Sequence, residues 1–240
     1  MYSYKCIFLC KHCSVGAGPF HDELLPIETI EKVLDQAYYI SSIKVVAAAG
    51  GEPTLYLSHL RTLLKKAADL SFITRVVTNA WWASTPQRAY HFLDDLRALG
   101  LEELNISYDD FHDEWLSRYG GWRNIVNAVR AAVDLGLRTV IAVVRAKNSL
   151  ITANVIRERL KLEGLDNKVL ILEDFLSPTS RAKGLETVIN VSGYGCGDVG
   201  HLSVHPNGDV AFCCGHIIND PESGWFTRIG NIYREISQTL

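Results

Sequence analysis

Short apolar runs alternate with amphipathic stretches from residue 3 to about residue 176 of this 240-residue chain. The runs are rich in Val, Ile and Leu, which suits strands, whereas the stretches between them repeat apolar residues every three or four positions, which suits helices. The pattern predicts six strand and helix units. The strands are expected at 6–9, 43–50, 72–78, 103–108, 138–144 and 168–175, and the helices at 26–40, 57–70, 86–100, 124–136 and 151–164.

The fold class follows from the way these elements alternate. Strands that are apolar along their whole length and are joined by helices are typical of a parallel sheet, and right-handed crossovers cover its outer face with those helices. Six units are fewer than the eight of a closed TIM barrel. We therefore expect an α/β fold with a partial (β/α)6 TIM-like barrel, and a flavodoxin-like or Rossmann-like open sheet is the alternative.

The last 50 or so residues follow a different pattern. Residues 201–214 alternate apolar and polar positions and turn at Asn207-Gly208, which predicts a β-hairpin. A nominal G-x-G-x-x-G at 195–200 is not followed by a helix, so it does not indicate a dinucleotide-binding loop. We expect a core at residues 1–185 and a small C-terminal β-hairpin extension at residues 186–240.

Composition and charge narrow the class of protein. Hydrophobic residues make up 48% of the chain, and the net charge of −3 with a pI near 6.2 provides no basic surface for nucleic acid or anionic membrane. The sequence shows no signal-peptide pattern and no apolar run of about 20 residues, so we expect a cytoplasmic protein that binds no membrane. The six cysteines lie at 6/10/13, 196 and 213/214, a grouping that suits metal binding better than a disulfide framework.

Cys6, Cys10 and Cys13 form a C-x3-C-x2-C run (CIFLCKHC). Three thiolates at this spacing can hold three corners of a cubane [4Fe-4S] cluster and leave the fourth iron without a protein ligand. An open iron is a place for chemistry. A closed zinc site with His12 or His21 as the fourth ligand is the alternative, although zinc motifs more commonly pair cysteines as C-x2-C.

Polar residues follow most of the predicted strands, at the end of the sheet where α/β folds bind their ligands. They include residues 50–54 after the second strand, Asn79 after the third, residues 107–112 after the fourth and Asn148 after the fifth. Each of them taken alone is also explained as an ordinary loop residue, because loops are polar in any case.

Together, the cysteine run and the Gly-Gly-Glu-Pro at residues 50–53 resemble the radical S-adenosylmethionine (radical SAM) superfamily, and the order of the motifs matches through about residue 181. The resemblance implies an enzyme in which SAM chelates the open iron. Reductive cleavage of SAM then yields a 5'-deoxyadenosyl radical that abstracts a substrate hydrogen. It also implies that Cys6, Cys10 and Cys13 are the cluster ligands.

The same resemblance implies a set of SAM-binding residues. The two glycines let the backbone approach the methionyl part of SAM, and Glu52 offers a carboxylate to its ammonium. His12 stands where the family often has an aromatic residue against the adenine. Arg181 lies in a stretch that resembles the adenine-contacting Gly-Arg-Ala, with Ser180 in place of the glycine. The full set is His12, Gly50, Gly51, Glu52, Asn79, Ser107, Asp109, Asn148 and Arg181.

Asp109, Asp110 and His112 form a compact group of two acids and an imidazole beside the expected cavity. As candidate catalytic residues, they bind substrate or shuttle a proton. The alternative is that this group caps the helix that follows, because an aspartate at that position satisfies free backbone amides. The sequence supports both interpretations.

Cys196, Cys213 and Cys214 resemble the opening of the C-terminal extensions called SPASM or twitch, which hold auxiliary iron-sulfur clusters. Three cysteines follow the core here, whereas a twitch cluster is expected to use four and a SPASM extension seven. We expect an auxiliary cluster with a non-cysteine or open fourth position, and a zinc site or plain buried thiols are the alternatives. The candidates for the fourth ligand are His201, His205, His216 and the substrate.

The sequence thus indicates a radical SAM enzyme that modifies a peptide, as in the maturation of ribosomally synthesised and post-translationally modified peptides (RiPPs). A radical SAM enzyme acting on a small metabolite is the first alternative, and a non-catalytic iron-sulfur or zinc protein is the alternative from another class. The expected partners are a peptide or small-molecule substrate and a reductant such as a flavodoxin or ferredoxin. The sequence does not choose between crosslinking, epimerisation and another oxidation as the reaction that follows hydrogen abstraction.

Overall fold

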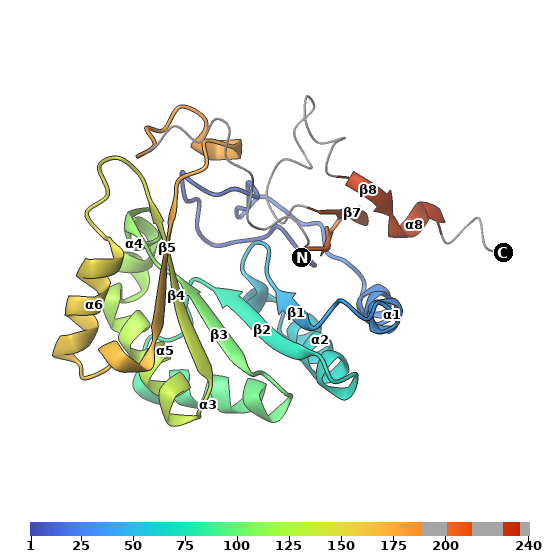
Figure 1. Ribbon diagram of the computed structural model, residues 1–240, viewed down its shortest axis with the longest axis horizontal. Helices are drawn as coiled ribbons and strands as arrows, with labels where there is room; N and C mark the ends of the chain where they lie inside the picture. The colour runs from blue at the N-terminus through green and yellow to red at the C-terminus, as the bar shows by residue number, and fades with distance from the viewer. Residues whose placement is uncertain (189–200, 213–227, 236–240) are drawn as a thin grey trace.

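The computed structural model describes residues 1–188, 201–212 and 228–235 (Figure 1). Its centre is a five-stranded parallel sheet, which is flanked by helices. The strands are β1 Val45–Ala48, β2 Ile73–Thr78, β3 Glu103–Ser107, β4 Arg138–Arg145 and β5 Leu170–Phe175. The α-helices are α1 Ile27–Tyr38, α2 Leu57–Asp69, α3 Pro86–Ala98, α4 Asp110–Leu116, α5 Trp122–Asp134 and α6 Ala153–Leu162. Short 3-10 helices lie at η1 Pro53–Leu55, η2 Ser117–Tyr119, η3 Asp166–Lys168 and η4 Ser180–Ala182.

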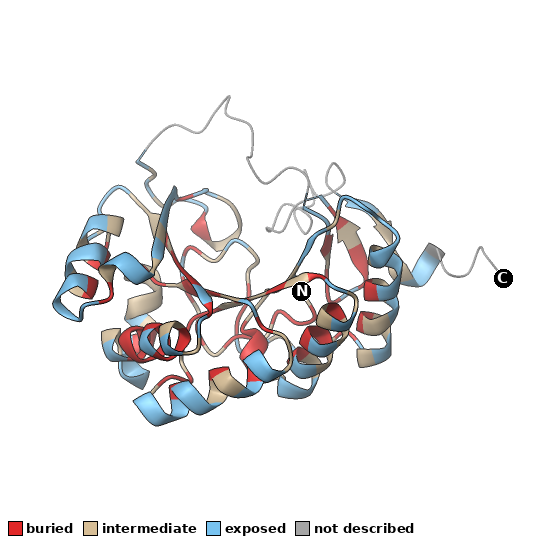
Figure 2. Ribbon diagram, turned by 60° about the horizontal axis from the view of Figure 1, so that its bottom comes forward, coloured by how far each residue is buried: buried red, intermediate tan, exposed pale blue. Residues whose placement is uncertain are grey.

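The strand order decides between the two expected architectures. The strands follow one another as β1-β2-β3-β4-β5, and each neighbouring pair is parallel. In a flavodoxin-like or Rossmann-like sheet, the order in which strands are added reverses at a switch point. In a barrel, each new strand is added beside the previous one. Figure 2 accordingly shows the helices gathered on one side of a curved sheet. The expected α/β fold of the partial-barrel type is confirmed.

The longer helices bury apolar residues that recur at helical spacing. In α5, Ile125, Val129 and Ala132 recur every three or four positions, and all three are fully buried. The start of α3 is fixed locally, because the Thr85 hydroxyl accepts a hydrogen bond from the Arg88 amide at 3.2 Å and a proline follows directly. Burying one such aliphatic side chain contributes about 1.5–3 kcal/mol.

Alternation along β3 assigns its two faces. Leu104 and Ile106 face the helices and are fully buried, whereas Asn105 and Ser107 lie half-buried on the opposite face. On that opposite face Arg75 of β2 pairs with Glu103 of β3, with Nε 2.5 Å from Oε1. Arg75, Glu103, Asn105 and Ser107 therefore lie on the face of the sheet away from the helices.

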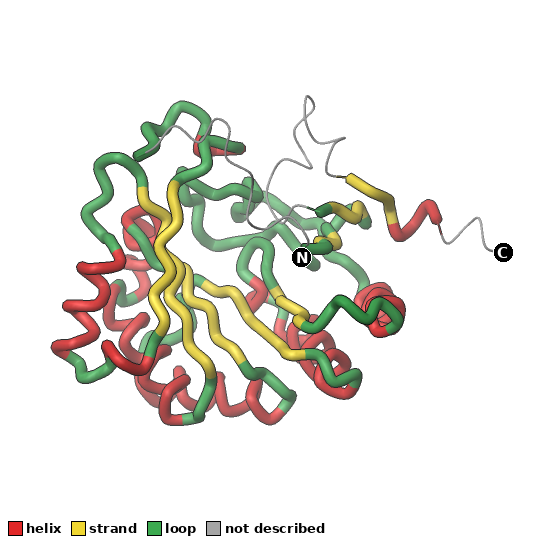
Figure 3. The backbone as a smooth tube through the Cα atoms, viewed as in Figure 1, coloured by secondary structure: helices red, strands yellow, loops and turns green. Residues whose placement is uncertain are grey.

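The expected first strand at 6–9 is not a strand of this sheet. Its neighbours Ser3 and Lys5 form isolated bridges with residues 24 and 18 of the same N-terminal stretch, which Figure 3 draws as loop. The amides of Gly51 and Glu52 donate to the carbonyls of Ser3 and Lys5 at 3.0 and 2.8 Å. The approach is close enough that a Cβ on Gly51 would lie 2.0 Å from the Lys5 oxygen, so the motif needs glycine there.

A small three-stranded antiparallel sheet carries the C-terminal part of the described chain. It consists of β6 Ser203–Val204, β7 Asp209–Ala211 and β8 Arg228–Asn231, and α8 Ile232–Glu235 follows. The predicted hairpin is the β6–β7 pair, and its turn residue Gly208 has a φ of +85°. The third strand is an addition that the sequence did not predict. None of the helices in the described ranges is both long and apolar enough to cross a bilayer.

The N-terminal stretch joins this small sheet to the barrel. The Met1 ammonium donates to the Val204 carbonyl at 2.7 Å, and the Tyr4 hydroxyl lies 2.6 Å from His205 Nδ1 in a buried contact. The division of the chain at residue 185 stays a prediction.

Candidate metal centre

The three N-terminal cysteines lie in one tight loop as free thiols. Cys6 and Cys10 are buried, and Cys13 is half-buried. The Cys6 amide donates to the Gly18 carbonyl at 3.1 Å, and the Cys13 amide donates to the Cys10 carbonyl at 3.2 Å, so the chain turns back on itself between them.

The surroundings of these thiols disfavour the bare thiolate. Burial, together with Glu52 and Cys13, raises the pKa of Cys6 to about 12. Burial, together with Cys6 and Cys13, also raises the pKa of Cys10. A cation bound between the three sulfurs would offset both effects, because thiolates and not thiols are metal ligands. The donor set therefore fits an iron-sulfur cluster held through three corners.

Glu52 is the buried centre of the loop that follows β1, with only 2% of its surface exposed. Its Oε1 accepts hydrogen bonds from the Thr54 amide at 3.2 Å, the Thr54 hydroxyl at 2.6 Å and the Thr78 hydroxyl at 2.8 Å. Its Oε2 accepts the Asn79 amide at 2.8 Å. Burial nevertheless raises the pKa of Glu52. This carboxylate ties the ends of β1 and β2 together, a role that the sequence motif did not reveal.

Asn79 links that carboxylate to the cysteine loop. Its Oδ1 accepts the Trp81 amide at 3.1 Å, which fixes the orientation of the side-chain amide and directs Nδ2 toward Cys6 Sγ at 3.7 Å. The Phe8 amide also donates to Cys6 Sγ, at 3.3 Å. Two N–H groups thus point at one sulfur, an arrangement that stabilises negative charge on it.

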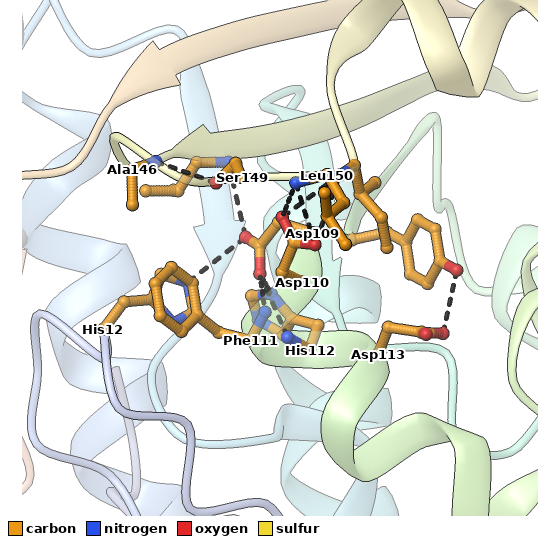
Figure 4. Close-up of polar contacts among 12 residues, drawn as sticks. His12, Asp109, Asp110, Phe111, His112, Asp113, Ala146, Ser149 and Leu150 are labelled. Atoms are coloured by element: carbon orange, nitrogen blue, oxygen red, sulfur yellow. Dashed lines mark hydrogen bonds and ion pairs between the residues drawn. The ribbon is translucent and has the colours of Figure 1, made fainter. Parts of the chain in front are cut away.

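Asp109 forms a second buried centre, at the end of β3 (Figure 4). Its Oδ1 accepts the amides of Phe111 and His112 at 3.0 Å, so it caps α4, and its Oδ2 accepts the Val144 amide at 3.3 Å. His12 Nε2 lies 3.3 Å from Oδ2, and His112 Nδ1 lies 3.0 Å from Oδ1. Burial alone would raise the pKa of Asp109, but His112 and His12 hold the pKa of this carboxyl well below its usual range.

His12 is held in place on several sides. Its ring is stacked on Phe111, with centroids 4.5 Å apart and planes at 13°, and His112 meets it edge-on at 4.8 Å. Burial lowers the pKa of His12, although Asp109 acts in the opposite direction. The contact with Phe111 could not be predicted, because it joins the cysteine loop to a helix about a hundred residues later in the chain.

The remaining candidates after the fourth and fifth predicted strands are Asp110, Ser107 and Asn148. The Asp110 carboxylate accepts the amides of Leu150 and Ile151 at 3.0 to 3.2 Å, so it holds the loop after β4. Ser107 lies half-buried at the end of β3, near the Asp109 centre in sequence. Asn148 is exposed on the loop after β4, and the structure does not bring it into either buried centre.

Arg181 reaches the cysteine loop from the segment after β5. Its guanidinium donates to the carbonyls of Cys10 and Gly16 at 3.0 and 3.3 Å and also to that of Ala17. Ser180 beside it has a φ of +52°, the left-handed conformation that a glycine would adopt most easily. Arg181 thus contacts the same loop as the cysteines, although the sequence suggested an adenine contact.

The C-terminal candidates fall mostly outside the described residues. These are Cys196, Cys213, Cys214 and His216. His201 is exposed, whereas His205 is buried against Tyr4.

Comparisons with known proteins bear on this arrangement. Residues 2–147 match the family model described as the Radical SAM superfamily. The chain is 21% identical over 230 residues to YydG of Bacillus subtilis (strain 168), whose name assigns it to peptide biosynthesis, and the match covers 88% of this chain and 66% of YydG. It also aligns with the radical S-adenosylmethionine methyltransferase TsrM from Kitasatospora setae, solved with cobalamin and a [4Fe-4S] cluster, at a TM-score of 0.49 and 16% identity. That alignment covers 74% of this chain and 37% of TsrM.

Proposed function

The chain belongs to the radical SAM superfamily, and we propose that it is a peptide-modifying enzyme that removes a hydrogen atom from its substrate. Its cofactors are a [4Fe-4S] cluster and SAM. When bound, they supply the reductive cleavage of SAM and the radical that takes the substrate hydrogen. The protein supplies binding, orientation and exclusion of water.

The observation that carries the proposal is the cysteine loop itself. Cys6, Cys10 and Cys13 are the proposed ligands of three irons. In support, burial raises the pKa of Cys6 and of Cys10, so these thiols need a cation in order to ionise. The N–H groups of Phe8 and Asn79 that point at Cys6 Sγ are suited to a thiolate ligand.

We assign SAM to the loops around this centre. The glycines at 50 and 51 and Glu52 take the methionyl part, and His12, stacked on Phe111, faces the adenine. Asp109 holds His12 in place through its Oδ2. Ser107, Asn79 and Asn148 complete the proposed set as the resemblance implied, and Arg181 serves the site through its hydrogen bonds to the cysteine loop.

Of the proposed catalytic group, His112 is the member that can move a proton. Its side chain is 16% exposed, whereas Asp109 is fully buried. The carboxylate of Asp110 is engaged by backbone amides of the loop after β4, so we assign it to the positioning of that loop.

A peptide substrate is supported by two observations. YydG, the relative from Bacillus subtilis, carries a name that refers to peptide biosynthesis. Strand β5 is an edge of the sheet, and its Leu170 and Leu172 are 57% and 50% exposed, so an extended peptide finds an apolar edge beside the barrel.

We propose RiPP-type maturation, with a flavodoxin or ferredoxin as the reductant. Residues 186–240 are the proposed SPASM/twitch-like extension, in which Cys196, Cys213 and Cys214 hold an auxiliary cluster.

The test of the chemistry is anaerobic reconstitution with iron and sulfide, followed by addition of SAM and dithionite. We expect a [4Fe-4S] signal in electron paramagnetic resonance and release of 5'-deoxyadenosine. Cys10→Ala should abolish both, because the cluster loses one corner, whereas Cys213→Ala should keep SAM cleavage and lose product. Full iron loading of the wild type without 5'-deoxyadenosine above background would refute the enzyme proposal.

The test of the substrate class is mass spectrometry of a short peptide encoded beside the gene, incubated with the reconstituted enzyme. The incubation is run in D2O, because an epimer has an unchanged mass in H2O but gains one deuterium when a solvent-exchangeable group returns the hydrogen. A crosslink instead removes two hydrogens from the peptide. Unchanged peptide together with SAM cleavage that a small metabolite stimulates would favour the metabolite alternative.

A further inference from the structure

Arg181 makes an unusual set of contacts for a residue so far along the chain. Its Nε donates to the Cys10 carbonyl at 3.0 Å, one terminal nitrogen donates to the Gly16 carbonyl at 3.3 Å, and the other donates to the Ala17 carbonyl. Each of these bonds spans more than 160 residues of sequence. All three nitrogens of the guanidinium are thus spent on one loop.

The loop has few hydrogen bonds of its own. Between residues 10 and 17 the backbone bonds within the described chain are those from the Cys13 amide to the Cys10 carbonyl at 3.2 Å and from the Gly16 amide to the Cys13 carbonyl at 3.3 Å. Two of the three carbonyls that Arg181 binds have a second partner, because the Cys10 carbonyl accepts the Cys13 amide and the Gly16 carbonyl lies 3.2 Å from His21 Nε2. Arg181 is the group that joins all three carbonyls to one distant segment of the chain. A planar guanidinium with five donors can serve three carbonyls at once, which a lysine ammonium on a flexible stem does less well.

The segment that carries Arg181 is itself anchored to the sheet. The Leu176 amide donates to the Arg145 carbonyl of β4 at 3.0 Å, and Ala182 is fully buried with its amide 2.9 Å from the Thr179 carbonyl. Between these anchors Ser180 adopts a φ of +52°. A left-handed non-glycine residue persists only where its surroundings dictate it, so this backbone shape is enforced.

We infer that Arg181 is a positioning residue that clasps the cysteine loop at Cys10, Gly16 and Ala17 and holds it in the shape that the cluster requires. The inference rests on the proposed function for its cluster, but the clasp itself is a property of the protein alone. Arg181 lies outside residues 2–147, the part of the chain that matches the family model. It also makes cluster loading depend on residues 176–182.

The first test is hydrogen–deuterium exchange on the full chain without its cluster. Arg181→Gln keeps a planar amide, but its shorter side chain has one NH2 group in place of the three donor nitrogens. Arg181→Lys keeps the positive charge but loses the planar guanidinium that bonds to three carbonyls at once. We expect both variants to exchange the amides of residues 10–18 at least tenfold faster than the wild type, while the amides of β3 exchange as before. Arg138→Gln is the matched control, because Arg138 pairs with Glu102 at 3.4 Å on the exposed surface.

The second test counts iron and sulfide per chain after reconstitution with limiting iron. We expect Arg181→Gln and Arg181→Lys to lose at least half of the cluster, and Arg138→Gln to load like the wild type. If Arg181→Lys exchanges and loads like the wild type, charge alone suffices and the clasp is refuted. If both variants load fully and only SAM binding weakens, Arg181 is a cofactor contact and the inference is wrong.

The two tests separate this inference from the proposed function. A wild type that binds no [4Fe-4S] cluster would overturn the proposed function, yet the exchange at residues 10–18 would still report on the clasp. A variant in which the β3 amides also exchange faster has lost its fold. In that event the Arg181→Lys comparison decides, since it is the milder replacement.

Discussion

The Thr78 hydroxyl donates to Glu52 Oε1 at 2.8 Å, which joins the end of β2 to the loop after β1. The same hydroxyl accepts the Trp82 indole N–H at 3.1 Å, and the Thr54 hydroxyl accepts the Trp81 indole N–H at 2.9 Å. The two tryptophans therefore support the threonines that hold the carboxylate. Glu52 is part of the architecture of the site as well as a proposed SAM ligand.

Glu52→Gln is predicted to destabilise the fold. Whichever way the glutamine amide turns, its NH2 faces a hydroxyl or amide that donates to the carboxylate in the wild type. An unsatisfied buried donor costs about 1–3 kcal/mol, and we expect a loss of that size in the free energy of unfolding. Urea denaturation measures it. Glu102→Gln, at a half-exposed side chain, is the control and should change stability by less than about 0.5 kcal/mol.

Asp109 predicts a stability that depends on pH. Burial would raise its pKa, but His112 and His12 hold it below the usual range. A carboxyl whose pKa is lower in the folded chain stabilises the fold above its unfolded pKa, near 4, and loses that contribution as the pH falls. We expect the free energy of unfolding to drop below about pH 4 by up to about 1.4 kcal/mol per pH unit more in the wild type than in Asp109→Asn.

The measurement for Asp109 is a series of urea titrations between about pH 5 and pH 2. Asp95→Asn, at an exposed aspartate that pairs with Arg61 at 2.9 Å, is the control and should follow the wild-type slope. Parallel curves for the wild type and Asp109→Asn would contradict the prediction. Because asparagine also caps helices well, the comparison reports mainly on charge.

Much of the barrel could be predicted from the sequence, because apolar periodicity is a local property of the chain. All five strands from β1 to β5 lie within one or two residues of expected runs. The first expected strand failed for a physical reason. Its neighbours bond to residues 18, 24, 51 and 52, and an apolar run of four residues does not reveal such partners.

The site divides in the same way. The cysteines and Glu52 were visible as motifs, since their spacing along the chain carries the signal. The supporting roles of Thr78, Phe111 and Arg181 were not visible, because each depends on a contact between segments far apart in sequence. Spatial partners of this kind have no local signature.

Ser180→Gly is predicted to stabilise the protein. A non-glycine residue in the left-handed region costs about 1–2 kcal/mol, whereas the extra freedom of glycine in the unfolded chain costs about 0.5–1 kcal/mol. The net gain should be about 0.5–1 kcal/mol, measured as a higher urea midpoint. Ser117→Gly is the matched control, because Ser117 has a φ of −53°, and it should lose stability. A loss at both positions would contradict the assignment of strain to Ser180.

Asn79→Ala is predicted to lower the reduction potential of the cluster. The wild-type amide directs Nδ2 at Cys6 Sγ, and hydrogen bonds to ligand sulfurs raise the potential of iron-sulfur clusters. A redox titration followed by electron paramagnetic resonance should give a more negative midpoint in the variant. Asn127→Ala is the control, since this buried asparagine donates to the Ala83 carbonyl at 2.9 Å instead. An unchanged midpoint in Asn79→Ala would rule out a tuning role for this bond.

His12→Ala is predicted to weaken the binding of SAM. The His12 ring is stacked on Phe111 at 4.5 Å, so a flat aromatic surface is already fixed at the position proposed for the adenine. Stacking of a base on an aromatic side chain is worth about 1–3 kcal/mol, which corresponds to a dissociation constant roughly 5- to 150-fold higher in the alanine variant.

His12→Phe keeps the ring and should bind SAM within about threefold of the wild type. Isothermal titration of the reconstituted protein measures both, with the exposed His91→Ala as control. If His12→Phe loses as much affinity as His12→Ala, the contact between His12 and Asp109 matters more than the stacking surface, and the adenine assignment of His12 fails.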